Sequence, residues 1–259
     1  MTIKSNPADP VTPRLAATVI LVRDGEVGLE VLMVRRNKKL DVAAGALVFP
    51  GGALNPDDGR EVSDLSIACR VAAVRETFEE AGILLARGDS GGQFIGAEQA
   101  GDILARYRPL LTQGTISFHD MIRHEELELA LDLLVPTVRW ITPEVRPKRY
   151  DTHFYICPAP AGQVARHDGS EAVEAIWVTP GDALEGAADG RFQILWPTQR
   201  SLAPLQTAQD VATAIDNARS KPVTTTMSTV RFFADGEIIT IPADAENAAE
   251  EHFVARPSA

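Results

Sequence analysis

The sequence predicts an α/β fold in which a mixed sheet is packed between layers of helices. Short β-branched and apolar runs alternate with longer helix-like segments along the 259 residues, an order typical of this class. Hydrophobic residues make up 45% of the chain, which is enough to bury a substantial core without a covalent staple. Two Asp-Gly pairs lie between apolar runs and predict hairpins. We therefore expect one elaborated domain.

A hairpin and a short strand open the predicted domain. Residues 16–22 and 29–34 are apolar and β-branched, and they flank Asp24 and Gly25, a pair that favours a tight hairpin turn. Residues 46–49 form a third strand-like run. The chain is therefore expected to begin with three strands.

A long amphipathic helix is predicted at residues 65–81, and Gly82 ends it. Its apolar residues recur at spacings of four and three, which places them on one narrow face. These residues are Ile67, Val71, Val74, Phe78 and Ala81. Upstream of the helix, Pro50, Gly51 and Gly52 predict a tight turn at which the backbone can approach a ligand closely.

An inserted helical segment is predicted at about residues 97–134, followed by a return to strands. Helices are expected at 97–107 and 120–134, the second from its apolar periodicity. A third helix is expected at 180–188, after Thr179. Further strands are expected at residues 140–142, 153–157, 174–178, 230–233 and 237–241. We place the main domain at 15–242, between a polar N-terminal segment (1–14) and a polar C-terminal tail (243–259).

Composition excludes several classes of function. A net charge of −11 and a pI near 4.9 argue against broad binding to nucleic acid or to anionic membranes. Cys69 and Cys157 lack metal-ligand spacing and are expected to be reduced core thiols. Neither a signal peptide nor a membrane span is visible, so a cytoplasmic protein is expected.

Three carboxylates gather on the polar side of the predicted helix. Glu76, Glu79 and Glu80 lie within five positions, and spacings of three and four bring them to one patch. A solvated outer face is the ordinary explanation of such a pattern. A hard divalent cation such as Mg²⁺ or Mn²⁺ is the alternative, because it prefers carboxylate oxygens and is commonly shared with substrate phosphates.

The order of these motifs resembles the Nudix hydrolases, which cleave nucleoside diphosphates linked to another group. The resemblance is carried by Gly51-Gly52, a polar loop, and then a helix with Arg75-Glu76-x-x-Glu79-Glu80-x-Gly82. It implies a Nudix-type α/β/α sandwich and a Mg²⁺ or Mn²⁺ cofactor. The metal ligands would be Glu76, Glu79, Glu80 and the backbone carbonyl of Gly52.

The chain departs from the usual Nudix pattern at several positions. Gly52 and Arg75 are 23 residues apart, so the loop between them is longer than usual. Ile67 stands where the pattern expects its first glutamate, and Thr77 replaces an aliphatic residue. The loop offers acidic stand-ins for the missing glutamate, and spacing does not choose among them. They are Asp57, Asp58, Glu61 and Asp64.

An enlarged loop is similar to that of the coenzyme A and acyl-coenzyme A diphosphatases. Residues 149–154 and 176–178 also have counterparts there, and the resemblance spans about residues 15–240. It implies cleavage of the diphosphate to 3',5'-ADP and 4'-phosphopantetheine or its acylated form. The alternatives are another nucleoside diphosphate derivative, such as ADP-ribose or NADH, or a Nudix-fold sensor that binds a nucleotide without hydrolysing it.

The remaining candidate residues receive roles from chemistry and from the resemblance. Arg75 is expected to reach Glu79 at i+4 and hold its carboxylate, with an ordinary surface ion pair as the alternative. Glu171, upstream of a strand, is a candidate ligand or base. Phosphate binding is expected from guanidinium groups and from the glycine backbone. The candidates for substrate binding are Arg35, Arg36, Gly51, Gly52 and Arg149, with a solvated surface charge as the alternative for each arginine. A small-molecule substrate and a homodimer are the expected partners.

Overall fold

The computed structural model describes residues 10–60, 62–88, 92–243 and 249–255. Its centre is a mixed sheet with the strand order β10-β7-β8-β1-β2-β3, in which β4 also pairs with β1 and β9 with β2. The strands are β1 Arg14–Gly25, β2 Gly28–Arg36, β3 Leu47–Val48, β4 Gly51–Ala53, β7 Val135–Ile141, β8 Tyr150–Pro158, β9 Ala172–Val178 and β10 Thr224–Met227. Pairs β1–β8 and β10–β7 are parallel and the others antiparallel, so the mixed sheet is confirmed.

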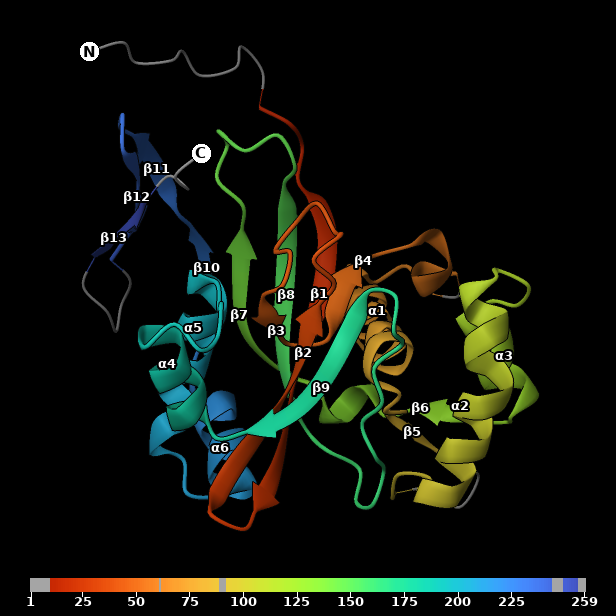
Figure 1. The fold of residues 1–259 in the computed structure, drawn as a ribbon. Helices are drawn as coiled ribbons and strands as arrows, with labels where there is room; N and C mark the ends of the chain where they lie inside the picture. The colour runs from red at the N-terminus through yellow and green to blue at the C-terminus, as the bar shows by residue number, and fades with distance from the viewer. Residues whose placement is uncertain (1–9, 61, 89–91, 244–248, 256–259) are drawn as a thin grey trace.

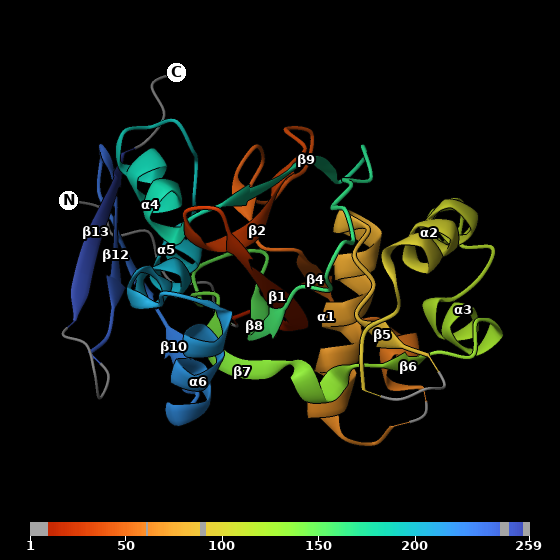
Figure 2. The same ribbon diagram turned by 90° about the horizontal axis from the view of Figure 1, so that it is seen from below.

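Helices cover the sheet on both faces, which confirms the expected α/β/α layering (Figures 1 and 2). On one side lies α1 Leu65–Ala81. On the other lie α4 Pro180–Ala188, α5 Trp196–Leu202 and α6 Val211–Ser220. Each interface has its own hydrophobic cluster, one around Phe78 and one around Ile20. The sheet therefore separates two cores, because its strands bury both of their faces.

The hairpin and α1 begin and end close to where the sequence predicts. The Asp64 carboxylate accepts a hydrogen bond from the Ser66 N–H and caps the helix, and Gly82 ends it with φ 71°, in the left-handed region. Its buried face is wider than the expected stripe: Ile67 and Val71 are only half-buried. Tertiary packing on two sides of α1 explains the difference.

The insert differs from the expected pair of long helices. Helix α2 Ala97–Thr112 extends beyond its predicted end, whereas α3 Phe118–His124 stops ten residues before the predicted one. Glu126 adopts φ 53°, which a helix cannot accommodate, and the chain continues into β6 Glu128–Leu129. Strand β6 pairs with β5 Ala86–Arg87, and a 3-10 turn, η2 Leu131–Leu133, follows it. The prediction of one helix over 120–134 was therefore wrong.

A separate three-stranded sheet lies at the C-terminal side of the fold (Figure 1). It contains β11 Thr229–Phe232, β12 Gly236–Ile241 and β13 Glu250–Ala255. The hairpin of β11 and β12 was predicted from its Asp-Gly pair, but β13 falls in the stretch expected to be a polar tail. Helices α5 and α6 were also not anticipated. No helix of the described part of the chain is long and apolar enough to cross a membrane.

Candidate active site

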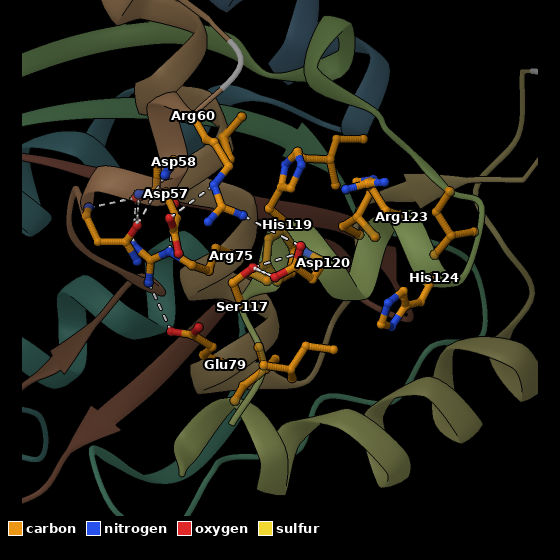
Figure 3. A pocket seen from close by; sticks show the side chains of 18 of the residues that line it. Asp57, Asp58, Arg60, Arg75, Glu79, Ser117, His119, Asp120, Arg123 and His124 are labelled. Carbon is orange, nitrogen blue, oxygen red and sulfur yellow. Dashed lines mark hydrogen bonds and ion pairs between the residues drawn. The ribbon is translucent and has the colours of Figure 1, made fainter. Parts of the chain in front are cut away.

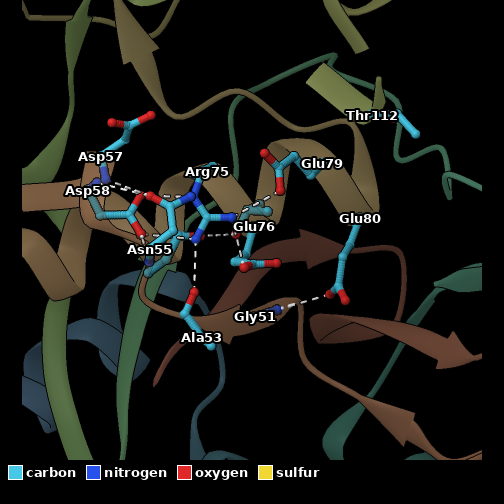
Figure 4. Close-up of polar contacts among 12 residues, drawn as sticks. Gly51, Ala53, Asn55, Asp57, Asp58, Arg75, Glu76, Glu79, Glu80 and Thr112 are labelled. Atoms are coloured by element: carbon cyan, nitrogen blue, oxygen red, sulfur yellow. Dashed lines mark hydrogen bonds and ion pairs between the residues drawn. The ribbon is translucent and has the colours of Figure 1, made fainter. Parts of the chain in front are cut away.

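Arg75 is the centre of a buried ion-pair network on α1. Its Nε and Nη2 donate to the two carboxylate oxygens of Asp58 at 2.8 and 3.0 Å. Its Nη1 donates to Glu76 at 2.8 Å and to Glu79 at 3.0 Å, and Nη2 also reaches the Ala53 carbonyl. The expected i+4 contact with Glu79 is therefore present, but it is one of several (Figure 4). Burial would lower the pKa of Arg75, yet these partners raise it, so the guanidinium stays charged.

Asp58 is the one loop acid, among those that the structure describes, that contacts this network. It lies in η1 Pro56–Gly59, a 3-10 helix whose capping box joins Asp58 and Asn55. Its carboxylate is buried and also accepts from the Asn55 N–H at 2.8 Å. Asp57 is exposed to solvent, Asp64 caps α1, and Glu61 lies outside the described residues. Asp58 thus anchors the arginine, a role that spacing alone did not assign.

The strand β4 brings the backbone against the acidic side of α1. The Gly51 N–H donates to Glu80 Oε2 at 3.0 Å. A Cβ on Gly52 would lie 2.5 Å from Glu76 Oε1, and one on Gly51 would lie 2.4 Å from Thr18 Oγ1. The glycines therefore permit the close approach that the sequence suggested, but in an extended strand paired with β1 and not in a tight turn.

Burial and mutual repulsion perturb the three carboxyl groups. Desolvation, with a contribution from Glu79, raises the pKa of Glu76 to about 7 although Arg75 opposes it. Burial and the charge of Glu76 raise the pKa of Glu80 to about 8. The pKa of Glu79 is also raised, again mainly by burial. Negative charge is therefore costly on this side of α1 unless a cation shares it.

The donor set suits a hard divalent cation, although the described residues contain no preformed group of three acidic, histidine or cysteine side chains around one point. Instead, Arg75 bridges Glu76 and Glu79, and Glu80 turns toward Gly51. Carboxylate oxygens with raised pKa values gain most from a cation, which favours their ionised form. The missing side chain of Gly52 lets the Glu76 carboxylate lie directly against the backbone of β4. The chemistry of these residues therefore fits such an ion, although their side chains do not surround one point in this structure.

A central cleft of about 1230 Å³ opens beside these residues. Glu76, Glu79 and Glu171 are the acidic side chains near the helix. The charge of Glu171 contributes to the raised pKa values of Glu76, Glu79 and Glu80, the three carboxyls of the Nudix motif, here called the box carboxyls. Other parts of the wall are basic and aromatic. The basic side chains there are Arg14, Arg36, Arg146 and Lys148, and the aromatic ones are Phe49, Trp140, Tyr150, Phe154 and Trp196.

The arginines proposed for substrate binding divide into two groups. Arg36 lines the central cleft and lies 3.6 Å from Glu80. Arg35 does not line it: the side chain pairs with Glu174 at 2.6 Å and packs over Phe192, because successive strand residues face opposite sides of the sheet. Arg149 is buried and donates to the carbonyls of Thr142 and Val11. Neither Arg35 nor Arg149 lines the central cleft, and the contacts given above lie within the protein, so their role in substrate binding stays a prediction.

Two unusual residues of the acidic helix also find their places. Thr77 is fully buried, and its hydroxyl donates to the Ala73 carbonyl at 2.7 Å, which satisfies the polar group inside the core. Ile67 lies at the opposite end of α1 from the glutamates and lines a second cavity.

Cys69 and Cys157 are free and buried, as expected. Arg108, missed in the sequence, donates twice to the Glu79 carbonyl.

Comparison with known proteins identifies the family. A family model described as the NUDT19 Nudix domain matches residues 55–202. The solved structure of a Nudix hydrolase from Alicyclobacillus acidocaldarius is 29% identical with a TM-score of 0.66, over 82% of this chain and 99% of that one. Since the family model covers more than half of the sequence, the chain belongs to the Nudix hydrolase family, in the group of the NUDT19 Nudix domain.

Curated relatives agree with this assignment at low identity. Putative nudix hydrolase 7 of Caenorhabditis elegans is 28% identical over 200 residues, which is 76% of this chain and 62% of the relative. The acyl-coenzyme A diphosphatase NUDT19 of Xenopus laevis is 26% identical over 205 residues, 60% of this chain and 54% of the relative. The human protein of that name is 32% identical over 127 residues, 46% of this chain and 34% of the relative. The chain thus spans about a third to three-fifths of the length of these relatives.

Proposed function

We propose that this protein is a divalent-metal-dependent hydrolase of the diphosphate in coenzyme A or acyl-coenzyme A. The products would be 3',5'-ADP and 4'-phosphopantetheine or its acylated form. The observation that carries the proposal is the contact of Glu76 and Glu80 with the Gly51–Gly52 backbone at the edge of a basic and aromatic cleft. The names of the NUDT19 relatives support the choice of substrate.

The cleft has the chemistry that a 3'-phosphorylated adenine nucleotide needs. Aromatic faces stack on a base, and guanidinium and ammonium groups bind phosphate. Trp140 and Trp196 line the cleft, and their indole N–H groups have no hydrogen-bond partner among the described residues. Arg146 and Lys148 belong to the same wall, where they pair with Glu237 and Asp41, and a phosphate would compete with these carboxylates. We assign this cleft to the nucleotide half of the substrate.

In the proposed site Glu76, Glu79, Glu80 and the Gly52 carbonyl hold Mg²⁺ or Mn²⁺. Such an ion neutralises phosphate charge and lowers the pKa of water at the reacting phosphorus. Arg75, anchored by Asp58, keeps the carboxylates of Glu76 and Glu79 in fixed positions. Arg36 binds the phosphate oxygens of the substrate, since its guanidinium reaches the cleft beside Glu80.

Hydrolysis then requires one proton acceptor. A water oxygen attacks phosphorus, the bond to the bridging oxygen breaks, and the leaving phosphate takes the electron pair. We assign Glu171 as the base that accepts the water proton, because its side chain lines the cleft close enough to influence the box carboxyls. One of the box glutamates is the alternative acceptor.

Turnover of a substrate panel tests the proposal. Purified protein with Mg²⁺ or Mn²⁺ should release 3',5'-ADP from coenzyme A and its esters, detected by chromatography, and EDTA should stop the reaction. ADP-ribose and NADH should react at least tenfold more slowly. Glu79→Gln should reduce turnover at least 100-fold with an unchanged circular dichroism spectrum, whereas the exposed Glu98→Gln should not. If the protein preferred ADP-ribose or NADH, the proposed substrate would be wrong and the preferred compound would take its place. If the protein turned over no compound of the panel, the alternative of a nucleotide sensor would be favoured.

The cytoplasmic location, the homodimer and the absence of nucleic-acid or membrane partners stay predictions from the sequence. One matched relative is named a peroxisomal coenzyme A diphosphatase, 35% identical over 65 residues. The acidic composition continues to argue against nucleic acid as a substrate.

A further inference from the structure

A second cavity of about 800 Å³ lies between α1, η1 and the inserted helix α3 (Figure 3). We call it the insert pocket. Arg75 and Glu79 line both this pocket and the central cleft. The two cavities therefore meet at the residues that the proposed function places beside the diphosphate, so a substrate with two arms has a separate place for each arm.

One ridge of α1 leads from the proposed reaction site into the insert pocket. Ile67, Val71, Arg75 and Glu79 recur every four residues, and all four line the pocket. Twelve residues of helix rise by about 18 Å, so the ridge is long enough to accompany an extended arm of a substrate. Its far end is apolar, because Ile67 stands where the Nudix pattern has a glutamate.

Part of the pocket lining is aliphatic. Ile67 and Val71 on α1 are accompanied by Leu111, Ile122 and Leu127 of the insert, and all five remain only half-buried. Partly exposed aliphatic side chains around one concave surface suit an apolar ligand more than solvent.

Several polar groups of the pocket are paired with one another. Arg60 lies 3.6 Å from both Asp57 and Asp120, and the Ser117 hydroxyl donates to Asp120 at 2.7 Å (Figure 3). For stacking on a base, this pocket offers Phe118, which is almost fully buried, and the imidazole rings of His119 and His124, whereas the central cleft has the larger and partly exposed rings of Tyr150 and Trp196. The wider cleft therefore holds the better stacking surfaces.

We propose that the insert pocket receives the acyl-pantetheine arm of the substrate and that Ile67 makes this pocket selective for an apolar acyl group. The inference rests on the proposed function and adds its acyl specificity. Each CH₂ of an acyl chain that becomes buried against these aliphatic side chains favours binding by about fourfold, whereas a carboxylate at position 67 would have to be desolvated and would oppose the chain.

The test replaces Ile67 and compares two substrates. Ile67→Glu introduces a carboxylate at the third helical position after the Asp64 cap, where glutamate is favourable for a helix N-terminus, so α1 should fold. Ile67→Met keeps an apolar side chain of similar volume. Leu65→Glu makes the same change to glutamate two residues earlier, at an exposed position that lines neither cavity.

The readout is the ratio of kcat/KM for octanoyl-coenzyme A to kcat/KM for free coenzyme A. We expect the wild-type ratio to exceed one, to fall at least tenfold in Ile67→Glu, and to change less than twofold in Ile67→Met and Leu65→Glu. An unaltered ratio in Ile67→Glu, or a wild-type ratio of one or less, would overturn the inference while coenzyme A cleavage still supported the proposed function. A wild-type protein that cleaves neither substrate would refute both.

Discussion

Arg75 is the residue on which the geometry of the acidic helix depends. The residue is only 5% exposed, and its guanidinium group makes five hydrogen bonds to four partners. A buried arginine keeps its charge at low cost only when anionic groups surround it. Asp58 is the partner bound through two parallel contacts, so it fixes the plane of the guanidinium and thereby the positions of Glu76 and Glu79.

Asp58→Asn should therefore lower both stability and activity. Arg75 would lose a paired carboxylate but keep two others, so we expect a loss of about 2–3 kcal/mol in the free energy of unfolding. Diphosphatase activity should fall at least tenfold in kcat, because the carboxylates would be held less firmly. Urea unfolding and steady-state kinetics measure the two effects.

Asp57→Asn is the matched control, because Asp57 is adjacent but exposed. Its free energy of unfolding should change by less than about 0.5 kcal/mol. If the two variants behaved alike, Asp58 would not anchor the network.

Glu80 gives a prediction about pH. Its folded-state pKa is raised to about 8, by burial first and then by Glu76, from a value of 4.5 without these effects. The folded protein therefore binds more protons than the unfolded chain between about pH 4.5 and 8, so this group loses its contribution to stability as pH rises through that window. Because glutamine does not ionise, Glu80→Gln should not show this loss of stability with rising pH. In EDTA, the Tm of the variant relative to wild type should rise from pH 5 to pH 8.5.

The same comparison of Tm values in excess Mg²⁺, without EDTA, tests whether a cation interacts with Glu80. A cation shared with Glu80 favours the carboxylate, so Mg²⁺ should raise the wild-type Tm at pH 8.5 more than that of Glu80→Gln. A Tm difference that is flat with pH in EDTA would show that Glu80 ionises freely in the folded protein.

At the scale of elements, the way the C-terminal end of α1 is packed fixes the position of the acidic side chains on that helix. Gly82 takes φ 71°, its N–H donates to the Phe78 carbonyl, and the chain turns there toward the core. A Cβ at this glycine would lie 2.9 Å from Leu104 of α2 and 3.2 Å from the Arg166 carbonyl. The helix end and the insert are thus packed through a position that only glycine fills easily.

Gly82→Ala should destabilise the protein by about 1–2 kcal/mol from the left-handed backbone alone, with more from the contact to Leu104. Gly101→Ala is the contrasting change, since Gly101 lies in α2 with open space around its Cβ position. It should stabilise the protein by about 0.5–1 kcal/mol. Thermal unfolding of both variants measures the difference. Equal effects of the two substitutions would contradict this account of the helix end.

Elements that depend on local signals were predictable, whereas contacts between distant segments were not. The first hairpin and α1 follow from an Asp-Gly pair and from helical periodicity. Periodicity also suggested a helix through residue 134, because a strand, β6, and a 3-10 turn present the same apolar residues to the core. Helix α3 cannot continue through Glu126, because that residue has φ 53°. Nothing strong in the sequence signals this backbone conformation.

The candidate site divides in the same way. Glu76, Glu79 and Glu80 could be grouped from helical spacing, and their nearness to the glycines follows from the resemblance to a family. Asp58 could not be chosen from four loop acids, because the loop folds into a 3-10 turn whose position depends on Arg75. The contacts of Arg149 could not be predicted either, because the backbone carbonyls that accept its hydrogen bonds lie 7 and 138 residues away in sequence.

At the scale of the whole molecule, α1 separates two cavities that share Arg75 and Glu79. The central cleft is walled largely by aromatic and basic side chains, whereas the insert pocket combines an aliphatic cluster with charged and polar side chains. A substrate with a charged nucleotide at one end and an apolar arm at the other matches this division, with its diphosphate at the boundary. Under the proposed function, the inserted helices would therefore extend the substrate site of the Nudix fold in addition to covering its core.

Binding of Mn²⁺ to the wild-type protein and to Glu76→Gln tests the central claim most directly. Electron paramagnetic resonance counts free Mn²⁺ during a titration at pH 8 in the presence of 3',5'-ADP. We predict that the wild type binds at least one Mn²⁺ and that Glu76→Gln weakens the binding at least tenfold, because Glu76 lies against Gly52 and beside Glu79. Equal Mn²⁺ binding by the two proteins would contradict the claim that these carboxylates hold a cation against a diphosphate.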